Sequence, residues 1–366
     1  MKRKINFNAG PATLPEPVLQ ELAKATLQYG KTGTSVLELQ HRGSAFGEIL
    51  EECNALVHEL CGIGPEYEVI WLHGGGRLQF CMIPMNFLPE GKVAAYIDSG
   101  QWAHEAMQYA AYYGDTKIVA SSRESGYAHL PQWPARLPAK AAYLHLTTNN
   151  TIYGTQWHDI PACSKPLIAD MSSDILSRRH DHSRYAMFYA AAQKNLGVPG
   201  VALAVVHKDM LRKAARPLPP MLSYKAQAAE RSVVNTANVP GIYTALLMLR
   251  WTKQRGIAAI EKENTAKAEL LYGQLDKSRI FVPRVSEKAH RSQMNVCFTT
   301  NDMAHEQPFL DMCARHNIIG IKGHRYTGGF RVSMYNAVSL ADVAALVDVM
   351  REFEDLSPSP LLRRGR

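Results

Sequence analysis

The chain has 366 residues, of which 46% are hydrophobic and 20% charged, an ordinary balance for a globular protein with a large core. No apolar run approaches the roughly 18 residues that a membrane-spanning helix needs, and the basic start lacks the apolar segment of a secretory signal. The net charge of +8 is dispersed rather than interleaved with aromatic residues, which argues against nucleic-acid binding and suits an enzyme with anionic ligands.

Strand-like and helix-like stretches alternate from Val69 onward, which is the rhythm of βαβ units. Strands are predicted over residues 69–73, 93–97, 117–120, 142–146, 166–169, 186–190 and 201–206. Helices are predicted over residues 77–86, 102–113 and 240–254. Several of the strands are continuous apolar runs, as buried parallel strands are. We therefore predict an α/β fold with a mostly parallel seven-stranded sheet that is covered on both faces.

The pattern changes near residue 255 and predicts a second, smaller α/β domain. Its expected elements are helix 257–277, strand 294–299, helix 304–316, strand 330–335 and a last helix. Ser339 is expected to cap the last helix, with Asp342 three residues later completing a capping box.

The six cysteines are scattered along the chain and form no Cys-x-x-Cys pair. They are Cys53, Cys61, Cys81, Cys163, Cys297 and Cys313. Most lie in apolar surroundings, so we expect reduced thiols in a cytoplasmic protein, with neither disulfides nor a metal site.

Lys194 lies on a turn of small residues between the predicted strands 186–190 and 201–206. Most lysines in such Gly/Pro turns are at the solvated tip of a hairpin. If the turn shields this amine from water, however, burial lowers its pKa and makes it a usable nucleophile and base.

Three other features lie directly after predicted strands, where ligands bind in α/β folds. Gly74–Gly76, followed by Arg77, open a helix and can cradle a phosphate, although a simple tight turn has the same pattern. Asp170 can pair with a protonated ring nitrogen or merely cap a loop. The hydroxyl of Thr151 can contact a cofactor or form a hydrogen bond within its own turn.

An aromatic residue and two His-Arg pairs complete the candidate site. Trp102 begins a helix after a glycine turn, where it can stack on a planar cofactor or pack in the core. The pairs His41–Arg42 and His324–Arg325, with Arg331 nearby, each lie beside glycine and suggest a pocket for more than one anion. Lysine, aspartate, stacking ring and phosphate cradle are together what pyridoxal phosphate requires, so we predict this cofactor.

Six segments resemble those of the phosphoserine aminotransferase family, within the class-V pyridoxal-phosphate enzymes. They are NAGPATLP (8–15), GTSVLELQHRG (33–43), HGGGRLQF (73–80), AQKN (192–195), AELLYG (268–273) and KGHR with GFR (322–331). The resemblance runs in order from residue 5 to about residue 354. It implies a fold-type I homodimer with a large domain over 16–255 and a small domain formed by 1–15 and 256–366.

The same resemblance implies reversible transamination between phosphoserine with 2-oxoglutarate and 3-phosphohydroxypyruvate with glutamate, in serine biosynthesis. A role in pyridoxine biosynthesis through 4-phosphohydroxy-L-threonine is a second hypothesis. The alternative within the class is an alanine–glyoxylate or serine–pyruvate aminotransferase, whose substrates carry no phosphate and would not need two His-Arg pairs. A nucleic-acid-binding protein and a catalytically silent scaffold are the alternatives from other classes; the presence of Lys194 and Asp170 disfavours the scaffold.

Residue roles follow from the resemblance position by position. Lys194 would bind the cofactor's aldehyde, Asp170 its ring nitrogen and Trp102 its ring face. The other implied cofactor contacts are Gly76, Arg77, Thr151 and Gln193, with Asn235 and Thr236 from the neighbouring subunit. The implied substrate contacts, some across the dimer interface, are His41, Arg42, His324, Arg325 and Arg331. The chain departs from the family where Ala9 replaces a serine, Leu78 a glycine and Gln293 an arginine.

Overall fold

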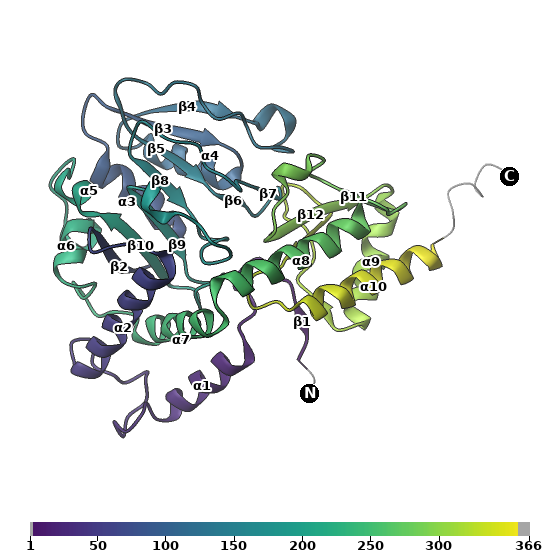
Figure 1. Ribbon diagram of the computed structural model, residues 1–366, viewed down its shortest axis with the longest axis horizontal. Coiled ribbons are helices and arrows are strands. Elements are labelled where there is room, and N and C mark those ends of the chain that lie inside the picture. Colours follow the sequence, from purple (N-terminus) through teal and green to yellow (C-terminus); the bar gives the residue numbers. More distant parts are fainter. Residues whose placement is uncertain (1–2, 358–366) are drawn as a thin grey trace.

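A seven-stranded sheet forms the centre of the larger part of the molecule in the computed structural model, which describes residues 3–357 (Figure 1). Its strands are, in spatial order, β2 (Tyr67–His73), β10 (Val201–His207), β9 (Met187–Ala191), β8 (Leu167–Asp170), β5 (Ala141–Thr147), β3 (Val93–Asp98) and β4 (Asp115–Ser121). Neighbours from β9 to β4 are parallel, and only β10 runs antiparallel to both of its neighbours. The predicted mostly parallel seven-stranded sheet is confirmed.

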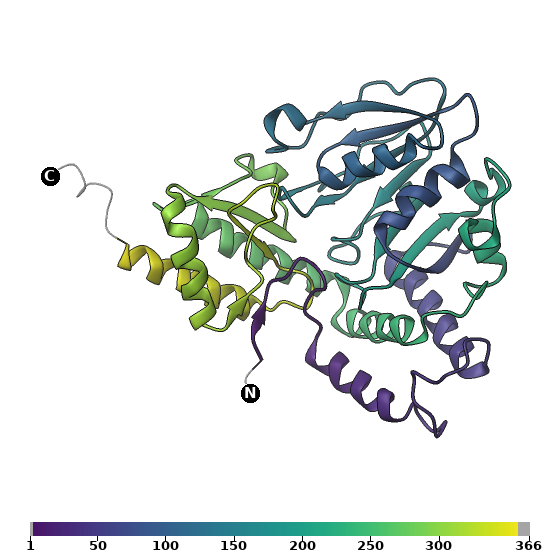
Figure 2. The same ribbon diagram turned by 180° about the vertical axis from the view of Figure 1, so that it is seen from behind.

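Helices cover both faces of this sheet (Figure 1 and Figure 2). Along β10, Leu203 and Val205 pack with α2 (Ser44–Cys61) and α7 (Val239–Arg255). The alternate residues Ala204 and Val206 pack with the opposite layer, because successive strand side chains point to opposite faces. That opposite layer contains α3 (Gly76–Phe87), α4 (Gln101–Ala110), α5 (Lys208–Arg212) and α6 (Tyr224–Ala229). The remaining helix, α1 (Glu16–Leu27), packs against α7.

The smaller part combines three helices with short strands. They are α8 (Ile257–Leu275), α9 (Glu306–Arg315) and α10 (Leu340–Leu356), with the antiparallel sheet β11 (Phe281–Pro283), β12 (Asn295–Thr300) and β14 (Phe330–Ser333). The capping box predicted for Ser339 and Asp342 is present at the start of α10. The larger part also has a two-strand hairpin of β6 (Asn149–Asn150) and β7 (Thr155–Gln156).

The N-terminal arm packs with this smaller part. Strand β1 (Ile5–Asn6) pairs in parallel with β13 (Ile318–Ile319), and Phe7 is fully buried in the core that contains Phe298 and Phe330. The domain boundaries at residues 16 and 256 remain a prediction, and residues 1–2 and 358–366 of the predicted small domain lie outside the described part of the chain.

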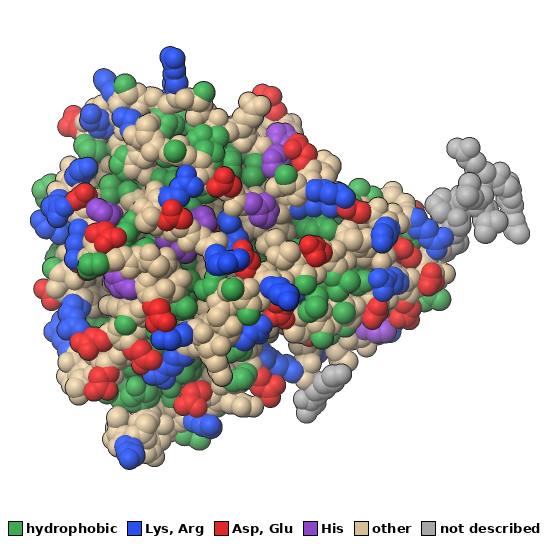
Figure 3. Space-filling model, in the orientation of Figure 1, with side chains coloured by type: hydrophobic (Ala, Val, Ile, Leu, Met, Phe, Trp, Pro, Cys, Tyr) green, Lys and Arg blue, Asp and Glu red, His purple; other side chains and the backbone are tan. Residues whose placement is uncertain are grey.

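The structure also shows how the charged side chains and the six cysteines are distributed. Basic and acidic side chains intermingle over the face in view (Figure 3), so the net charge is not gathered there. Between residues 3 and 357, no helix combines the length and the apolar character that crossing a bilayer requires. All six cysteines are free, and burial raises the thiol pKa of Cys53, Cys61, Cys297 and Cys313.

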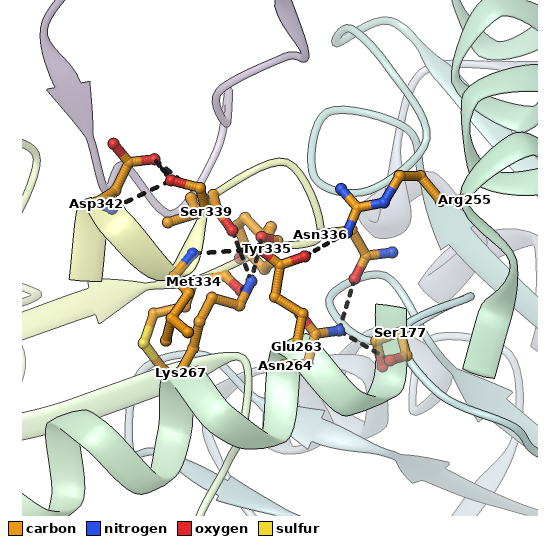
Figure 4. Close-up of polar contacts among 12 residues, drawn as sticks. Ser177, Arg255, Glu263, Asn264, Lys267, Met334, Tyr335, Asn336, Ser339 and Asp342 are labelled. Atoms are coloured by element: carbon orange, nitrogen blue, oxygen red, sulfur yellow. Dashed lines mark hydrogen bonds and ion pairs between the residues drawn. The ribbon is translucent and has the colours of Figure 1, made fainter. Parts of the chain in front are cut away.

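A buried polar network connects α8 with the segment after β14 (Figure 4) and, through Asn336, with the turn that carries Lys194. Lys267 on α8 is fully buried and donates to the carbonyl oxygens of Met334 (3.0 Å), Tyr335 (3.1 Å) and Val338 (2.8 Å). One turn earlier, Asn264 donates to the side chain of Asn336 (3.0 Å). The backbone N–H of Asn336 in turn donates to Asn195 Oδ1 (3.1 Å), next to Lys194 in the chain.

Replacing Lys267 with methionine is expected to lower the free energy of unfolding by roughly 2 kcal/mol or more. The carbonyl of Tyr335 keeps the N–H of Val338 (2.9 Å), but those of Met334 and Val338 would lose their donor. Each unsatisfied group costs about 1–3 kcal/mol. Burial lowers the pKa of Lys267 to about 7, but only the ammonium form has a proton for each carbonyl. Urea unfolding measures the loss. Lys262→Met, an exposed position on the same helix, is the control, and an equal loss in both variants would contradict the prediction.

Candidate active site

A cavity of about 270 Å³ opens at the carboxyl ends of the parallel strands β5, β8 and β9. Its walls are formed by Gly75, Gly76, Arg77, Phe80, Trp102, Thr147, Asn149, Asp170, Ser172, Ser173, Ala191, Gln193 and Lys194. Six of the residues predicted from the sequence are therefore together in one cavity: Gly76, Arg77, Trp102, Asp170, Gln193 and Lys194.

Lys194 lies on the turn after β9, with the fully buried Ala190 and Ala192 before it. Burial lowers the pKa of its amine to about 8, helped by the charge of Arg331 and opposed by that of Asp170. The N-terminal arm closes over this turn, because the N–H of Ala12 donates to the carbonyl of Gln193 (2.9 Å). The turn is thus shielded, as the functional interpretation of the lysine requires.

Asp170 is the last residue of β8 and is buried at the rim of the cavity. Its Oδ1 accepts the backbone N–H of Ser172 at 2.9 Å. The hydroxyl of Ser172 accepts the N–H of Ala191 at 3.0 Å, which links the ends of β8 and β9. The carboxylate is held in place by the backbone and can face a ring nitrogen inside the cavity.

The glycine segment begins α3 and exposes the first N–H groups of that helix. Gly74 has φ +87°, a left-handed conformation that favours glycine, and Gly75 caps the helix. Such a helix start binds anions through its free N–H groups. The side chain of Arg77 is turned to Glu105 (Nε to Oε1 2.7 Å) and lies 5.1 Å from the centre of the Trp102 ring. The guanidinium of Arg77 is thus already paired within the chain.

Thr151 supports the aromatic wall from outside the cavity. The indole N–H of Trp102 donates to Thr151 Oγ1 (2.9 Å), and Arg331 on β14 donates to the carbonyl of Thr151 (3.3 Å). Thr151 is not among the cavity walls, so in a single chain its hydroxyl orients the ring. His324 and Arg325 precede β14; burial lowers the pKa of His324, and the charges of Arg331 and Arg325 add to the effect. Arg331 thereby joins the smaller part to the rim of the site.

The other predicted residues lie elsewhere in the single chain. His41 and Arg42 border a second cavity of about 270 Å³, where Arg42 donates to the carbonyl of Val233 (3.4 Å). Asn235 and Thr236 lie beside His73, whose Nε2 is 2.9 Å from the carbonyl oxygen of Thr236. The structure does not bring these four residues to Lys194.

Several cavity residues were missed by the sequence interpretation. Thr147 ends β5 directly beside Asp170, and this shared position at the ends of adjacent parallel strands was the available signal. Asn149 donates to the hydroxyl of Ser173 (2.8 Å). Phe80 and Ser172 carry no local signal that separates them from ordinary helix and loop residues.

The walls of the cavity fit pyridoxal phosphate. They offer an amine, a carboxylate, an aromatic face and the start of a helix. Two buried wall atoms, Thr147 Oγ1 and Gln193 Oε1, have no hydrogen-bond partner among the described residues, and a polar group bound in the cavity can satisfy them.

Comparison with known proteins identifies the family of the chain. The aminotransferase class-V family model matches residues 5–346. The chain is 45% identical to a phosphoserine aminotransferase of Phocaeicola vulgatus over 97% of this chain and 99% of that one. It superposes on the phosphoserine aminotransferase of Bacillus circulans subsp. alkalophilus with a TM-score of 0.94, at 40% identity over 97% and 99% of the two chains. A pyridoxal-phosphate-bound phosphoserine aminotransferase of Trichomonas vaginalis gives a TM-score of 0.89, at 31% identity over 95% and 100%. The chain belongs to the class-V aminotransferase family.

Proposed function

We propose that this chain is a pyridoxal-phosphate-dependent phosphoserine aminotransferase that exchanges an amino group between phosphoserine and 2-oxoglutarate. The observation that carries the proposal is the cavity in which a shielded lysine amine, a buried aspartate and a helix start meet. It occurs in a chain that matches phosphoserine aminotransferases along almost its whole length. The products are 3-phosphohydroxypyruvate and glutamate, which makes the enzyme a step of serine biosynthesis.

Each of the cavity residues has a separate role in this proposal. The bound cofactor supplies a ring that withdraws electrons from the α-carbon of the amino acid. Lys194 Nζ would remove the proton from the α-carbon of the amino acid and carry it until it is delivered again later in the reaction. Its lowered pKa keeps part of the amine in the basic form near neutral pH. Asp170 would keep the ring nitrogen of the cofactor protonated, Trp102 would stack on the ring, and the N–H groups at the start of α3 would bind the phosphate.

We further propose that the protein works as a homodimer. His41, Arg42, Asn235 and Thr236 lie away from the cavity of their own chain, and a second copy can supply these residues to it. A cytoplasmic location is proposed from the free, mostly buried thiols, which suit a reducing compartment. The role in pyridoxine biosynthesis stays a second hypothesis; a strain that lacks this protein and still grows without added pyridoxine would count against it.

An absorbance titration of the purified protein tests the reaction. Protein loaded with pyridoxal phosphate is titrated in turn with phosphoserine, serine and alanine. The proposal requires that phosphoserine change the visible spectrum at a far lower concentration than the other two. Equal or better response to alanine or serine would move the function to an alanine–glyoxylate or serine–pyruvate aminotransferase. A protein that takes up no cofactor would overturn the proposal altogether.

Arg42→Ala is expected to raise the KM for phosphoserine by about 10- to 100-fold, since a charge-assisted bond to phosphate contributes about 1.5–3 kcal/mol. The rate with alanine at saturating concentration should change little. Arg231→Ala is the matched control, because Arg231 borders the same cavity and already pairs with Glu51 (2.7 Å). Equal losses for phosphoserine and alanine would remove the case that Arg42 binds the phosphate.

A further inference from the structure

A cluster of two histidines and a glutamate lies where the two parts of the molecule meet. His129 belongs to the loop after β4, whereas Glu287 and His290 belong to the segment between β11 and β12. One candidate ligand atom of each lies within 4.8 Å of the others. None of the three borders the cavity of Lys194. We propose that they form a binding site for a divalent transition-metal ion, best matched by Zn²⁺.

The hydrogen bonds of the two histidines show which ring nitrogen of each carries no proton and can bind a metal. His129 Nδ1 lies 2.8 Å from the carbonyl oxygen of Leu130, so Nδ1 carries the proton and Nε2 is free. A bond from the second ring nitrogen to a carbonyl is the usual support of metal-binding histidines. The backbone N–H of Leu130 donates to His290 Nδ1 in a long bond (3.3 Å), so that nitrogen carries no proton. It has a single lone pair, and a metal ion bound there would take the place of this hydrogen bond.

His290 Nδ1 is also 3.1 Å from Glu287 Oε2. Two acceptor atoms this close repel each other unless a proton or a metal ion lies between them. In a tetrahedral zinc site, bonds of about 2.0–2.1 Å place the ligand atoms about 3.4 Å apart. The observed separation therefore suits two ligands of one ion. His129, with one candidate ligand atom within 4.8 Å of both, is the third member of a His₂Glu set, with water as the fourth ligand.

The surroundings allow a cation to enter. The Glu287 side chain is 57% exposed and that of His290 26%, so one side of the cluster is open to water. The neighbouring cations are turned away, because both Lys288 (3.4 Å) and Arg291 (2.6 Å) pair with Asp276. A metal here would reinforce an existing contact between the two parts, in which Arg284 donates to the carbonyl of Gly126 (3.1 Å).

Calorimetric titration of the cofactor-loaded protein with ZnCl₂, in a buffer without phosphate or chelator, tests the proposal. One Zn²⁺ per chain should bind, Co²⁺ should give the absorption bands of a tetrahedral site, and Zn²⁺ should raise the unfolding temperature. His129→Ala and His290→Ala should each weaken binding more than about tenfold, because removing even an outer-shell partner typically costs about 10- to 100-fold.

His316→Ala is the matched control, because it removes an exposed His–Glu pair (His316 to Glu352, 3.3 Å) that has no second histidine. It should bind Zn²⁺ as the unaltered protein does. Glu287→Gln, which keeps the size of the side chain, separates loss of a ligand from loss of folding. Absence of saturable binding would overturn the proposal and leave a simple His290–Glu287 ion pair. Binding that survives both histidine substitutions would place the ion elsewhere and overturn it equally.

Discussion

Substituting Lys194 with alanine should reduce transamination by more than about 10⁴-fold. Removal of a general acid–base group alone costs about 10²- to 10⁴-fold, and this substitution also removes the covalent attachment of the cofactor. The visible absorbance that depends on the bond between Lys194 and the cofactor should disappear, while the protein stays folded, because the turn is held by backbone bonds such as Ala12 to Gln193.

Two measurements make this result specific. Lys208→Ala is the control, since Lys208 lies just past β10, has a half-buried side chain and forms an ion pair only with Glu68 (3.4 Å) among the described residues. A small primary amine added to the Lys194→Ala protein should restore part of the rate by supplying the missing base. Turnover at the wild-type rate in Lys194→Ala would sink the assignment of the nucleophile.

The lowered pKa of Lys194 also predicts how the cofactor-free protein takes up pyridoxal phosphate. Only the neutral amine attacks the aldehyde, so the rate should rise with pH and level off above about 8, where most of the amine has lost its proton. An ordinary lysine would continue to gain rate up to about pH 10.4. A stopped-flow series across this range distinguishes the two cases.

The core of the site could be predicted because chain order and sheet geometry agree there. Lys194 and Asp170 both follow apolar strands, and parallel strands bring their carboxyl ends to one edge. The capping box at Ser339 is equally local: two side chains three residues apart determine it. Local sequence patterns were therefore enough to predict both the sheet and the cofactor cavity.

Other parts depend on contacts that local patterns do not encode. The helix α2 was overlooked although Phe46, Leu50, Cys53 and Val57 recur at helical spacing, because no strand precedes it to mark a βαβ unit. In the cluster of His129, Glu287 and His290, the first residue lies far from the other two in the chain. The spacing of Glu287 and His290 alone therefore does not indicate that a third ligand lies beside them.

For Arg42, the sequence predicts a function but not the site at which the residue acts. Its motif predicts a role in binding, but whether it acts on its own cavity or on that of a second copy depends on assembly. In the single chain its guanidinium meets only the carbonyl of Val233 among the described residues, so the proposed dimer is what would give the motif its function.

Asp170→Asn should lower kcat/KM by about 10- to 10³-fold. An opposite charge within about 4–6 Å raises the pKa of a cationic group by about 1–3 units, so a neutral amide would reduce the protonated fraction of the ring nitrogen by that factor. The substitution keeps an oxygen that can accept the Ser172 N–H (2.9 Å) and so keeps the shape of the cavity. The test therefore isolates the charge.

A second readout connects Asp170 to Lys194. The carboxylate opposes the lowering of the Lys194 pKa, so in Asp170→Asn the pH midpoint of cofactor uptake should fall below about 8. Asp98→Asn is the control: Asp98 is buried at the end of β3, accepts from the Tyr127 hydroxyl (3.0 Å), does not border the cavity and is not among the charges that act on Lys194. A cofactor analogue methylated at the ring nitrogen holds its positive charge permanently and should restore activity to Asp170→Asn alone. If the analogue fails while the pH midpoint still moves, Asp170 acts on the lysine and not on the ring nitrogen.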